Sequence, residues 1–232
     1  MSGAKQKLLL LGASGSIGQA IHQKFAAQAW DVVGVTRNEV SESCQISWNP
    51  FDKTSAFPDE QGPFDAVCWA QGKNINDSIY SFNDEIHREM YEANVLYVLN
   101  SVNYLLKNNL LTKPSRLCVI SSIWQEIARQ NKLSYCVSKS ALKGLILSLA
   151  NDMGVDGHLV NAILPGALDT PMTHQNLSEK QLGAVLNSTQ FGRLPSLQDV
   201  ANAAYFLCSD ENTGMTGQFI KVDLGYSDVR II

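Results

Sequence analysis

Short runs of apolar residues alternate along this chain with longer segments in which apolar residues recur every three or four positions. The short runs are typical of strands, and the longer segments are typical of helices with one buried face. The expected strands are Leu8–Leu11, Asp31–Val35, Gln45–Trp48, Asp65–Ala70, Leu117–Ile120, Leu159–Leu164 and Phe219–Val222, and the expected helices are Ile17–Ala29, Asn83–Lys107 and Ser134–Asp152. Continuously apolar strands separated by helices predict an α/β fold, with helices on both faces of a doubly wound parallel sheet of about seven strands.

The whole chain, residues 1–232, is expected to form one domain. Its length divided by about 150 residues per domain gives about 1.5, and no repeat, linker or low-complexity segment divides the sequence. The one long irregular stretch, about Leu168 to Phe191, carries several apolar side chains. We interpret this stretch as a lid over a substrate rather than as a domain boundary.

The composition excludes several classes of partner. Eighteen basic and 22 acidic residues give a net charge of −4, so no basic surplus is available for nucleic acid or an anionic membrane. The five cysteines form no CxxC pair and the four histidines are scattered, so we expect no metal site. No run of apolar residues is long enough to span a membrane. These features favour a cytoplasmic protein that acts on a small molecule.

Three glycines follow the first expected strand and open the first expected helix. Gly12, Gly15 and Gly18 stand in the sequence LLLLGASGSIGQAI. A diphosphate approaches the backbone closely at such a turn, and the N-terminus of the following helix offers unpaired N–H groups and a positive dipole end. A tight turn with close packing of the helix is the alternative. With the second strand that follows, the motif predicts a Rossmann fold that binds a dinucleotide, with Ser14 and Ser16 as hydroxyls of the phosphate loop.

The end of the second strand indicates which dinucleotide is preferred. Folds that bind NAD place an acidic residue there, against the 2′-hydroxyl of the ribose. Here the positions hold Thr36 and Arg37. A guanidinium beside a hydroxyl would pair with a 2′-phosphate, which favours NADP(H) over NAD(H). The alternative is that Arg37 is a solvated loop residue and that Glu39 supplies the acid.

Tyr135 and Lys139 are four residues apart in YCVSK on an expected helix, so they share one face. A free phenol has a pKa of about 10, and an ammonium about 4 Å away could lower that value by up to about three units. Such a tyrosine could exchange a proton with an alcohol oxygen near pH 7. Ser122, at the end of the fifth strand, could bond the same oxygen, although Ser121 is adjacent to it. The alternative is a helix with one core tyrosine and one surface lysine.

With these residues the chain resembles the short-chain dehydrogenase/reductase family, in its compact single-domain branch. The resemblance covers nearly the whole sequence and includes GASGSIG, Ser122 with Tyr135 and Lys139, and NAILPGALDTPM. It implies hydride transfer between a nicotinamide and a carbonyl or alcohol carbon. Tyr135 would be the acid/base, Lys139 would lower its pKa and bind the nicotinamide ribose, Ser122 would orient the carbonyl oxygen, and Asn94 would hold a water in the proton relay.

The same resemblance implies a set of cofactor contacts. These are Gly12, Ser14, Gly15, Ser16, Ile17, Gly18, Thr36, Arg37, Ala70, Gly72, Tyr135, Lys139, Pro165, Gly166 and Thr170. Some positions depart from the family's pattern: Leu11 replaces a threonine, Ser16 replaces a glycine, and WAQG and Asp223-Leu224-Gly225 replace NNAG and DGG. These departures bear on cofactor affinity and preference, and not on the residues that transfer the proton.

The leading hypothesis is an NADP(H)-dependent oxidoreductase that acts on a carbonyl or secondary alcohol of a small or medium neutral substrate. A 3-oxoacyl thioester is one candidate, and the resemblance implies a homo-oligomer, dimeric or tetrameric. Trp124 could line the substrate pocket or only pack, and Arg129 is expected to be a solvated loop residue. The glycine spacing also suggests a nucleotide-sugar epimerase or dehydratase, but we expect no room for its additional C-terminal domain. A dinucleotide sensor without turnover is a third hypothesis.

Overall fold

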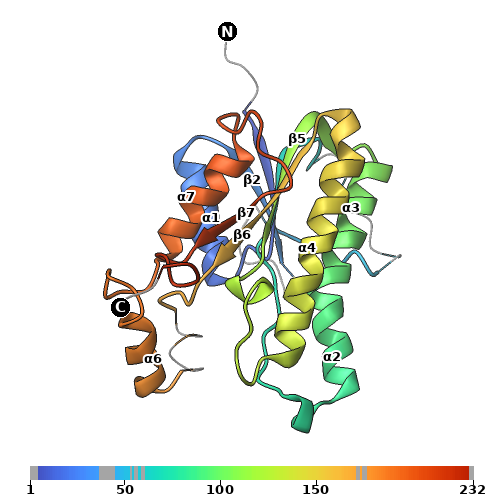
Figure 1. The fold of residues 1–232 in the computed structure, drawn as a ribbon. Coiled ribbons are helices and arrows are strands. Elements are labelled where there is room, and N and C mark those ends of the chain that lie inside the picture. Colours follow the sequence, from blue (N-terminus) through green and yellow to red (C-terminus); the bar gives the residue numbers. More distant parts are fainter. Residues whose placement is uncertain are drawn as a thin grey trace.

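A seven-stranded sheet forms the centre of the protein (Figure 1). The computed structural model describes residues 5–36, 45–52, 54, 57–58, 61–170, 173 and 177–229. Every strand pair is parallel, and the strand order is β3-β2-β1-β4-β5-β6-β7. The strands are β1 (Lys7–Leu11), β2 (Asp31–Thr36), β3 (Gln45–Ser47), β4 (Phe64–Trp69), β5 (Leu111–Ile120), β6 (Leu159–Pro165) and β7 (Phe219–Val222). The predicted doubly wound α/β fold is therefore confirmed.

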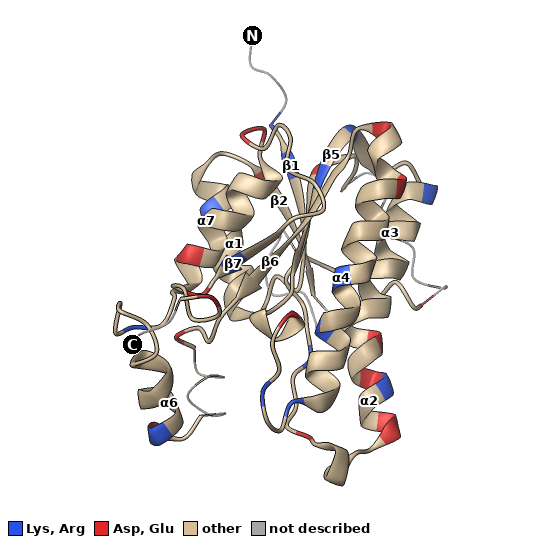
Figure 2. Ribbon diagram, in the orientation of Figure 1, with Lys and Arg blue, Asp and Glu red and all other residues tan. Residues whose placement is uncertain are grey.

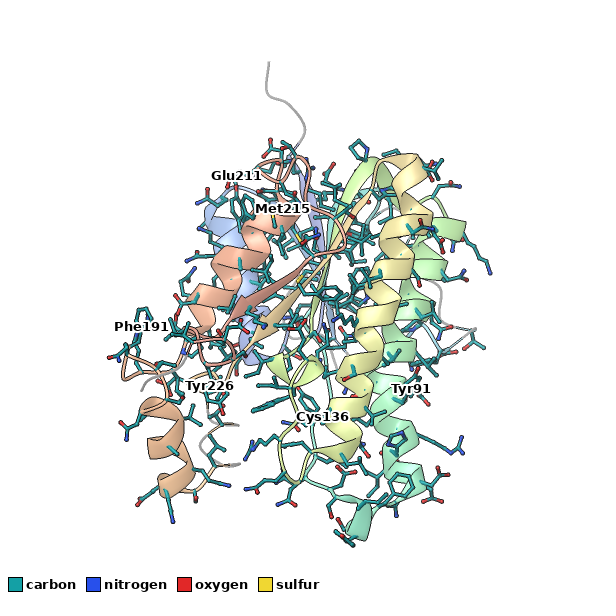
Figure 3. The ribbon with its side chains drawn as sticks, in the orientation of Figure 1. Tyr91, Cys136, Phe191, Glu211, Met215 and Tyr226 are labelled. Carbon is teal, nitrogen blue, oxygen red and sulfur yellow. The ribbon has the colours of Figure 1, made fainter. Side chains whose placement is uncertain are left out.

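Helices cover both faces of this sheet. Figure 1 shows α1 (Ser16–Ala27) and α7 (Leu197–Cys208) on one face, and α3 (Tyr97–Lys107) and α4 (Leu133–Met153) on the other. Alternate residues of β1 pack into the two cores: Leu8 and Leu10 face α1 and α7, whereas Leu9 and Leu11 face the opposite core. All four leucines are fully buried, and side chains fill the space on both sides of the sheet (Figure 3). Burial on both faces explains why the strand runs lack polar alternation.

The long helix predicted over Asn83–Lys107 is interrupted. The structure has α2 (Asp84–Tyr91), then one π-helical segment, η3 (Glu92–Leu96), and then α3. A π turn holds one extra residue and often marks a functional site. Asn94 lies in this segment, and its side chain hydrogen-bonds the backbone of Lys73. The interruption therefore coincides with a contact to the segment after β4.

The stretch expected to be irregular contains a helix, so that part of the prediction is wrong. Residues Glu179–Leu186 form α6, which begins with a capping box in which Ser178 and Gln181 bond each other's backbone. The pattern Ser-x-x-Gln is a known helix start signal, but the helix is too short to show clear periodicity. Three short helices complete the described fold: η2 (Ile79–Ser81), η4 (Ile123–Gln125) and η5 (Gly154–Asp156).

Candidate active site

A cavity of about 710 Å³ opens where the sheet strands end. Strand order reverses between β1 and β4, and ligands of open α/β sheets bind at the carboxyl ends of strands at such a point. The cavity brings together most of the residues predicted from the sequence: Gly12, Ser14, Gly15, Ser16, Ile17, Thr36, Ala70, Gly72, Ser122, Tyr135, Lys139, Pro165, Gly166 and Thr170. Gly18 and Asn94 are not part of this lining, and Arg37 lies outside the described residues.

The three glycines of the turn have different physical roles. A Cβ on Gly12, whose φ is +83°, would lie 2.5 Å from the backbone nitrogen of Gln71, and a Cβ on Gly18 would lie 2.2 Å from the carbonyl oxygen of Gly12. These two glycines therefore permit close packing inside the protein. Gly15 differs, because its Cβ would meet only the Gly12 carbonyl oxygen, at 3.6 Å, and it lines the cavity. Gly15 is the position at which a ligand can approach the turn.

The start of α1 suits an anion. The N-cap residue, Gly15, provides no side-chain cap, and the first turn contains no acidic residue. Uncapped backbone N–H groups and the helix dipole together favour a phosphate at this place. Farther along the cavity, the buried Oε1 atom of Gln71 has no hydrogen-bond partner among the described residues. A dinucleotide fits both features, since it offers phosphates to the helix and donor groups to the amide.

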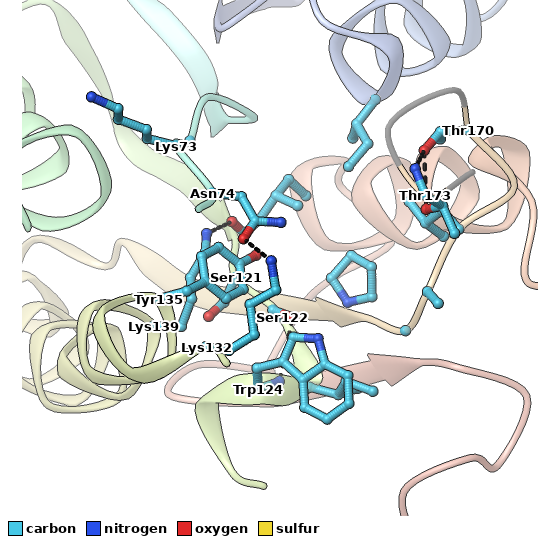
Figure 4. A pocket seen from close by; sticks show the side chains of 18 of the residues that line it. Lys73, Asn74, Ser121, Ser122, Trp124, Lys132, Tyr135, Lys139, Thr170 and Thr173 are labelled. Atoms are coloured by element: carbon cyan, nitrogen blue, oxygen red, sulfur yellow. Dashed lines mark hydrogen bonds between the residues drawn. The ribbon is translucent and has the colours of Figure 1, made fainter. Parts of the chain in front are cut away.

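Ser122, Tyr135 and Lys139 lie close together in the same cavity (Figure 4). Ser122 follows β5, and its hydroxyl is near enough to the phenol of Tyr135 on α4 to lower the pKa of that phenol. Lys139 lies one helical turn along α4, 4% exposed, and donates from Nζ to the carbonyl oxygen of Ile120 at 3.1 Å. Its Nζ is 5.7 Å from the centre of the Tyr135 ring. The backbone of β5 thus fixes the ammonium beneath the phenol.

The pKa of Tyr135 differs from the sequence-based expectation. Burial raises it from 10.0 to about 12, and the hydrogen bond with Ser122 lowers it only in part. The predicted lowering by Lys139 is wrong for this arrangement, because the ammonium points at the Ile120 carbonyl and lies below the ring. Burial also lowers the pKa of Lys139, from 10.5 to about 8. Near pH 7 the phenol is therefore protonated and the amine is mainly charged.

The neighbouring serine has a different partner. Ser121 donates its hydroxyl hydrogen to Oε1 of Gln125 at 2.8 Å. Ser122 is the serine whose hydroxyl lies near the Tyr135 phenol, and its Oγ accepts a hydrogen bond from the backbone N–H of Trp124 at 3.3 Å. The geometry therefore distinguishes two residues that the sequence leaves side by side.

Asn94 lies outside the cavity lining and hydrogen-bonds two segments that carry site residues. Its Oδ1 accepts from the backbone N–H of Lys73 at 2.8 Å, and its Nδ2 donates to the Lys73 carbonyl at 3.0 Å and to the Ser138 hydroxyl at 2.9 Å. A Cβ on Gly72 would lie 3.2 Å from Asn94 Oδ1 and 3.7 Å from Lys139 Nζ. The side chain thereby ties the segment after β4 to α4 at the level of Lys139.

The part of the cavity around Tyr135, here called the substrate end, contains residues that no sequence motif indicates. Asn74, Lys132, Gln181 and Tyr226 line the cavity, as do Trp124 and Arg129. The rings of Trp124 and Tyr226 meet edge to face with centres 6.3 Å apart, so Trp124 belongs to a cavity wall. Arg129, expected in solvent, is half-buried against the same cavity. The sequence does not indicate that Asn74 and Lys132 are in contact, because they are 58 residues apart along the chain.

A parallel sheet with a glycine turn at its switch point and a Ser-Tyr-Lys group in the same cavity defines a class of dinucleotide-dependent enzymes. A family model described as enoyl-(acyl carrier protein) reductase matches residues 55–227. The chain belongs to the short-chain dehydrogenase/reductase family of oxidoreductases.

Curated relatives match along nearly the full chain. The uncharacterized oxidoreductase YmfI of Bacillus subtilis (strain 168) is 26% identical over 94% of this chain and 97% of its own length. The 3-oxoacyl-[acyl-carrier-protein] reductase FabG of Escherichia coli (strain K12) is 27% identical over 94% of this chain and 95% of its own. Among solved structures, a gluconate 5-dehydrogenase from Burkholderia cenocepacia, in complex with NADP and tartrate, has a TM-score of 0.87 at 18% identity, covering 97% of this chain and 96% of its own.

Membrane insertion is not supported by any helix of the described part of the chain, since none combines the length and apolar character that crossing a bilayer requires.

Proposed function

We propose that this protein transfers a hydride between NADP(H) and the carbonyl or secondary alcohol carbon of a small or medium molecule. The observation that carries the proposal is the contact of Ser122 and Tyr135 above a buried Lys139, in the same cavity as the glycine turn. The relatives named as oxidoreductases support the reaction class. Working as a homo-oligomer in the cytoplasm is part of the same proposal.

Different residues of the cavity would bind different parts of the dinucleotide. The N-terminus of α1 and Gly15 would hold the phosphates of the dinucleotide, and Lys139 with Tyr135 would bind its nicotinamide ribose. Thr36 lines the cavity at the end of β2, and we propose that it binds a 2′-phosphate together with Arg37, the next residue in the sequence. NADP in a structural neighbour supports this choice of cofactor. When bound, the nicotinamide supplies or accepts the hydride.

Side chains of the protein donate the proton that the reduction requires. In reduction, the substrate oxygen gains negative charge, and a protonated phenol donates to it. Tyr135 is in that form near pH 7, since its pKa is raised to about 12. Ser122 orients the same oxygen through its hydroxyl, and the Lys139 ammonium stabilises the phenolate that proton donation leaves. The lid over the cavity includes α6, from which Gln181, Ala184 and Val185 reach the lining.

The test is a screen of NADPH consumption across aldehydes, ketones and acyl thioesters, repeated with NADH. Tyr135→Phe is expected to lower kcat by at least 100-fold, because the proton donor is lost, while NADPH affinity stays within about twofold. Cofactor affinity is measured by fluorescence titration of the same preparations. Tight NADPH binding without oxidation by any carbonyl would support a dinucleotide sensor instead. Undiminished turnover in Tyr135→Phe would refute the proposed role of the phenol.

A further inference from the structure

Positive charge collects at the substrate end of the cavity. Four of its described lining residues are cationic, namely Lys73, Arg129, Lys132 and Lys139, and no described lining residue is acidic. The chain as a whole has a net charge of −4, so this local excess is not a consequence of composition. Figure 2 shows Lys and Arg positions on the loops beside the lower end of α4. A cavity lined in this way attracts anions.

Two of these cations are not placed to bind a substrate carboxylate. Lys139 donates a hydrogen bond to the Ile120 carbonyl and lies at the Tyr135 ring, where its charge would stabilise the phenolate. Lys73 forms an ion pair with Glu89, and its side chain points away from the Ser122–Tyr135 group (Figure 4). Lys132 and Arg129 remain, and neither has an acidic partner within ion-pair distance among the described residues.

Lys132 is placed as a ligand-binding group. Only 2% of it is exposed, and its Nζ donates to Asn74 Oδ1 at 2.7 Å and to the Ile75 carbonyl at 3.1 Å. An ammonium has three donors, so one is left for another acceptor. Asn74 is exposed to the cavity, and its Nδ2 group has no hydrogen-bond acceptor among the described residues. Figure 4 shows both side chains next to Tyr135, with Trp124 on the far side of Lys132.

Arg129 adds a second cation with no counter-charge of its own. Burial is the main cause that lowers the pKa of Lys132, and the charge of Arg129 is the second. The two cations therefore repel each other. The nearby acid is Asp77, which raises the pKa of Lys132 but uses its carboxylate to accept hydrogen bonds from the Ser134 backbone and hydroxyl at the start of α4. An anion between Lys132 and Arg129 would relieve the repulsion.

We infer that Lys132, Asn74 and Arg129 form a subsite for the carboxylate of the substrate. This inference rests on the proposed function and narrows its substrate class to short oxo acids, in place of the neutral substrate expected from the sequence. The Lys132 Nζ atom is 5.9 Å from the centre of the Tyr135 ring. Because Lys132 lies beside the ring whose phenol would hold the carbonyl, the substrates that fit this inference are short oxo acids, such as 2-oxo and 3-oxo acids.

The experiment compares each acid with its own ester, so that only the charge changes. Pyruvate and acetoacetate are measured against methyl pyruvate and methyl acetoacetate, with NADPH at pH 7. At least one acid is expected to exceed its ester tenfold or more in kcat/KM. Lys132→Met is expected to reduce that ratio at least tenfold, mainly by raising KM, and Arg129→Met is expected to reduce it less. Lys132→Arg, which keeps the charge, should recover part of the ratio.

Lys107→Met is the matched control, because Lys107 is exposed in the last turn of α3 and outside the cavity lining. It should leave the acid-to-ester ratio unchanged. The inference is overturned if the native protein uses both esters as well as the acids. It is also overturned if Lys132→Met weakens acid and ester equally, since that result indicates a purely structural lysine.

Binding without turnover separates this inference from the proposed function. Acetoacetate is titrated by calorimetry into protein saturated with NADP+, which cannot reduce it. The native protein is expected to bind acetoacetate at least tenfold more tightly than Lys132→Met does, and more tightly than methyl acetoacetate. Acetoacetate binding that depends on Lys132, with no oxidation of NADPH, would refute the proposed reaction and support the carboxylate subsite. Reduction of neutral carbonyls with no acetoacetate binding would support the proposed reaction and refute the carboxylate subsite.

Discussion

Lys139 allows the energetic cost of the candidate site to be measured directly. Burial lowers its pKa from 10.5 to about 8. A lysine with a lower pKa in the folded chain binds its proton less tightly there than in the unfolded chain, so the charged form destabilises the fold. The difference corresponds to about 3 kcal/mol. This penalty is fully present below about pH 8 and disappears as the pH rises to about 10.5, where the unfolded chain also loses the proton.

Lys139→Met removes the charge and keeps a side chain of similar length. The variant also loses the hydrogen bond to the Ile120 carbonyl, which costs about 1 kcal/mol. At pH 7 the free energy of unfolding of the variant is therefore expected to exceed that of the native protein by about 2 kcal/mol. At pH 10 about 1 kcal/mol of the penalty remains, because the unfolded chain still binds most of the proton. The lost hydrogen bond offsets this remainder, so the two proteins should then differ by less than about 0.5 kcal/mol.

The assay is urea unfolding of both proteins at pH 7, 8, 9 and 10, followed by far-UV circular dichroism. Only the difference between the two proteins is interpreted, so other groups that titrate in this range cancel. Lys107→Met, at an exposed position, should differ from the native protein by at most about 0.5 kcal/mol at every pH. A stability difference for Lys139→Met that stays constant from pH 7 to 10 would refute the reasoning.

Two further predictions concern the glycine turn and the cofactor. Gly18→Ala is expected to lower the free energy of unfolding by about 1–3 kcal/mol, because its Cβ would lie 2.2 Å from the Gly12 carbonyl oxygen. In contrast, Gly144→Ala in α4, where no atom lies within 4 Å of the added Cβ, should raise it by about 0.5–1 kcal/mol in the same denaturant assay. Arg37→Asp is expected to weaken NADPH binding at least tenfold more than NADH binding in fluorescence titrations; equal weakening of both would contradict the assignment of NADP(H).

The fold could be predicted because its main signals are local. The run Leu8–Leu11 is apolar without alternation, and a strand buried on both faces requires that composition. The glycines identify the turn because Gly12 and Gly18 fill positions that a Cβ would obstruct. Tyr135 and Lys139 are one turn apart on a helix, so their proximity follows from the helical repeat alone. Each signal lies within about ten residues.

The features that the sequence did not predict depend on contacts between distant segments. The π segment around Asn94 is accompanied by hydrogen bonds to Lys73, 21 residues away. The burial that raises the pKa of Tyr135 is produced by the packed fold and not by its neighbours in the chain. Lys132 was not selected because its partner Asn74 is 58 residues away. A pattern of residue types carries no information about which side chains become buried together.

The electrostatics of the cavity connect the stability of the fold with its proposed chemistry. Lys132 and Lys139 are both nearly fully buried, and burial is the main cause that lowers the pKa of each. Buried charges of this kind raise the free energy of the folded chain unless anionic groups reach them. Both ammonium groups lie within 6 Å of the centre of the Tyr135 ring, at 5.9 and 5.7 Å. In the proposed reaction Lys139 acts on the phenolate and Lys132 on the substrate carboxylate, and fixed charges stabilise negative charge there without reorganisation. The unfavourable burial of two lysines is thus the counterpart of anion binding, and ligands that neutralise them would restore the stability that the free protein lacks.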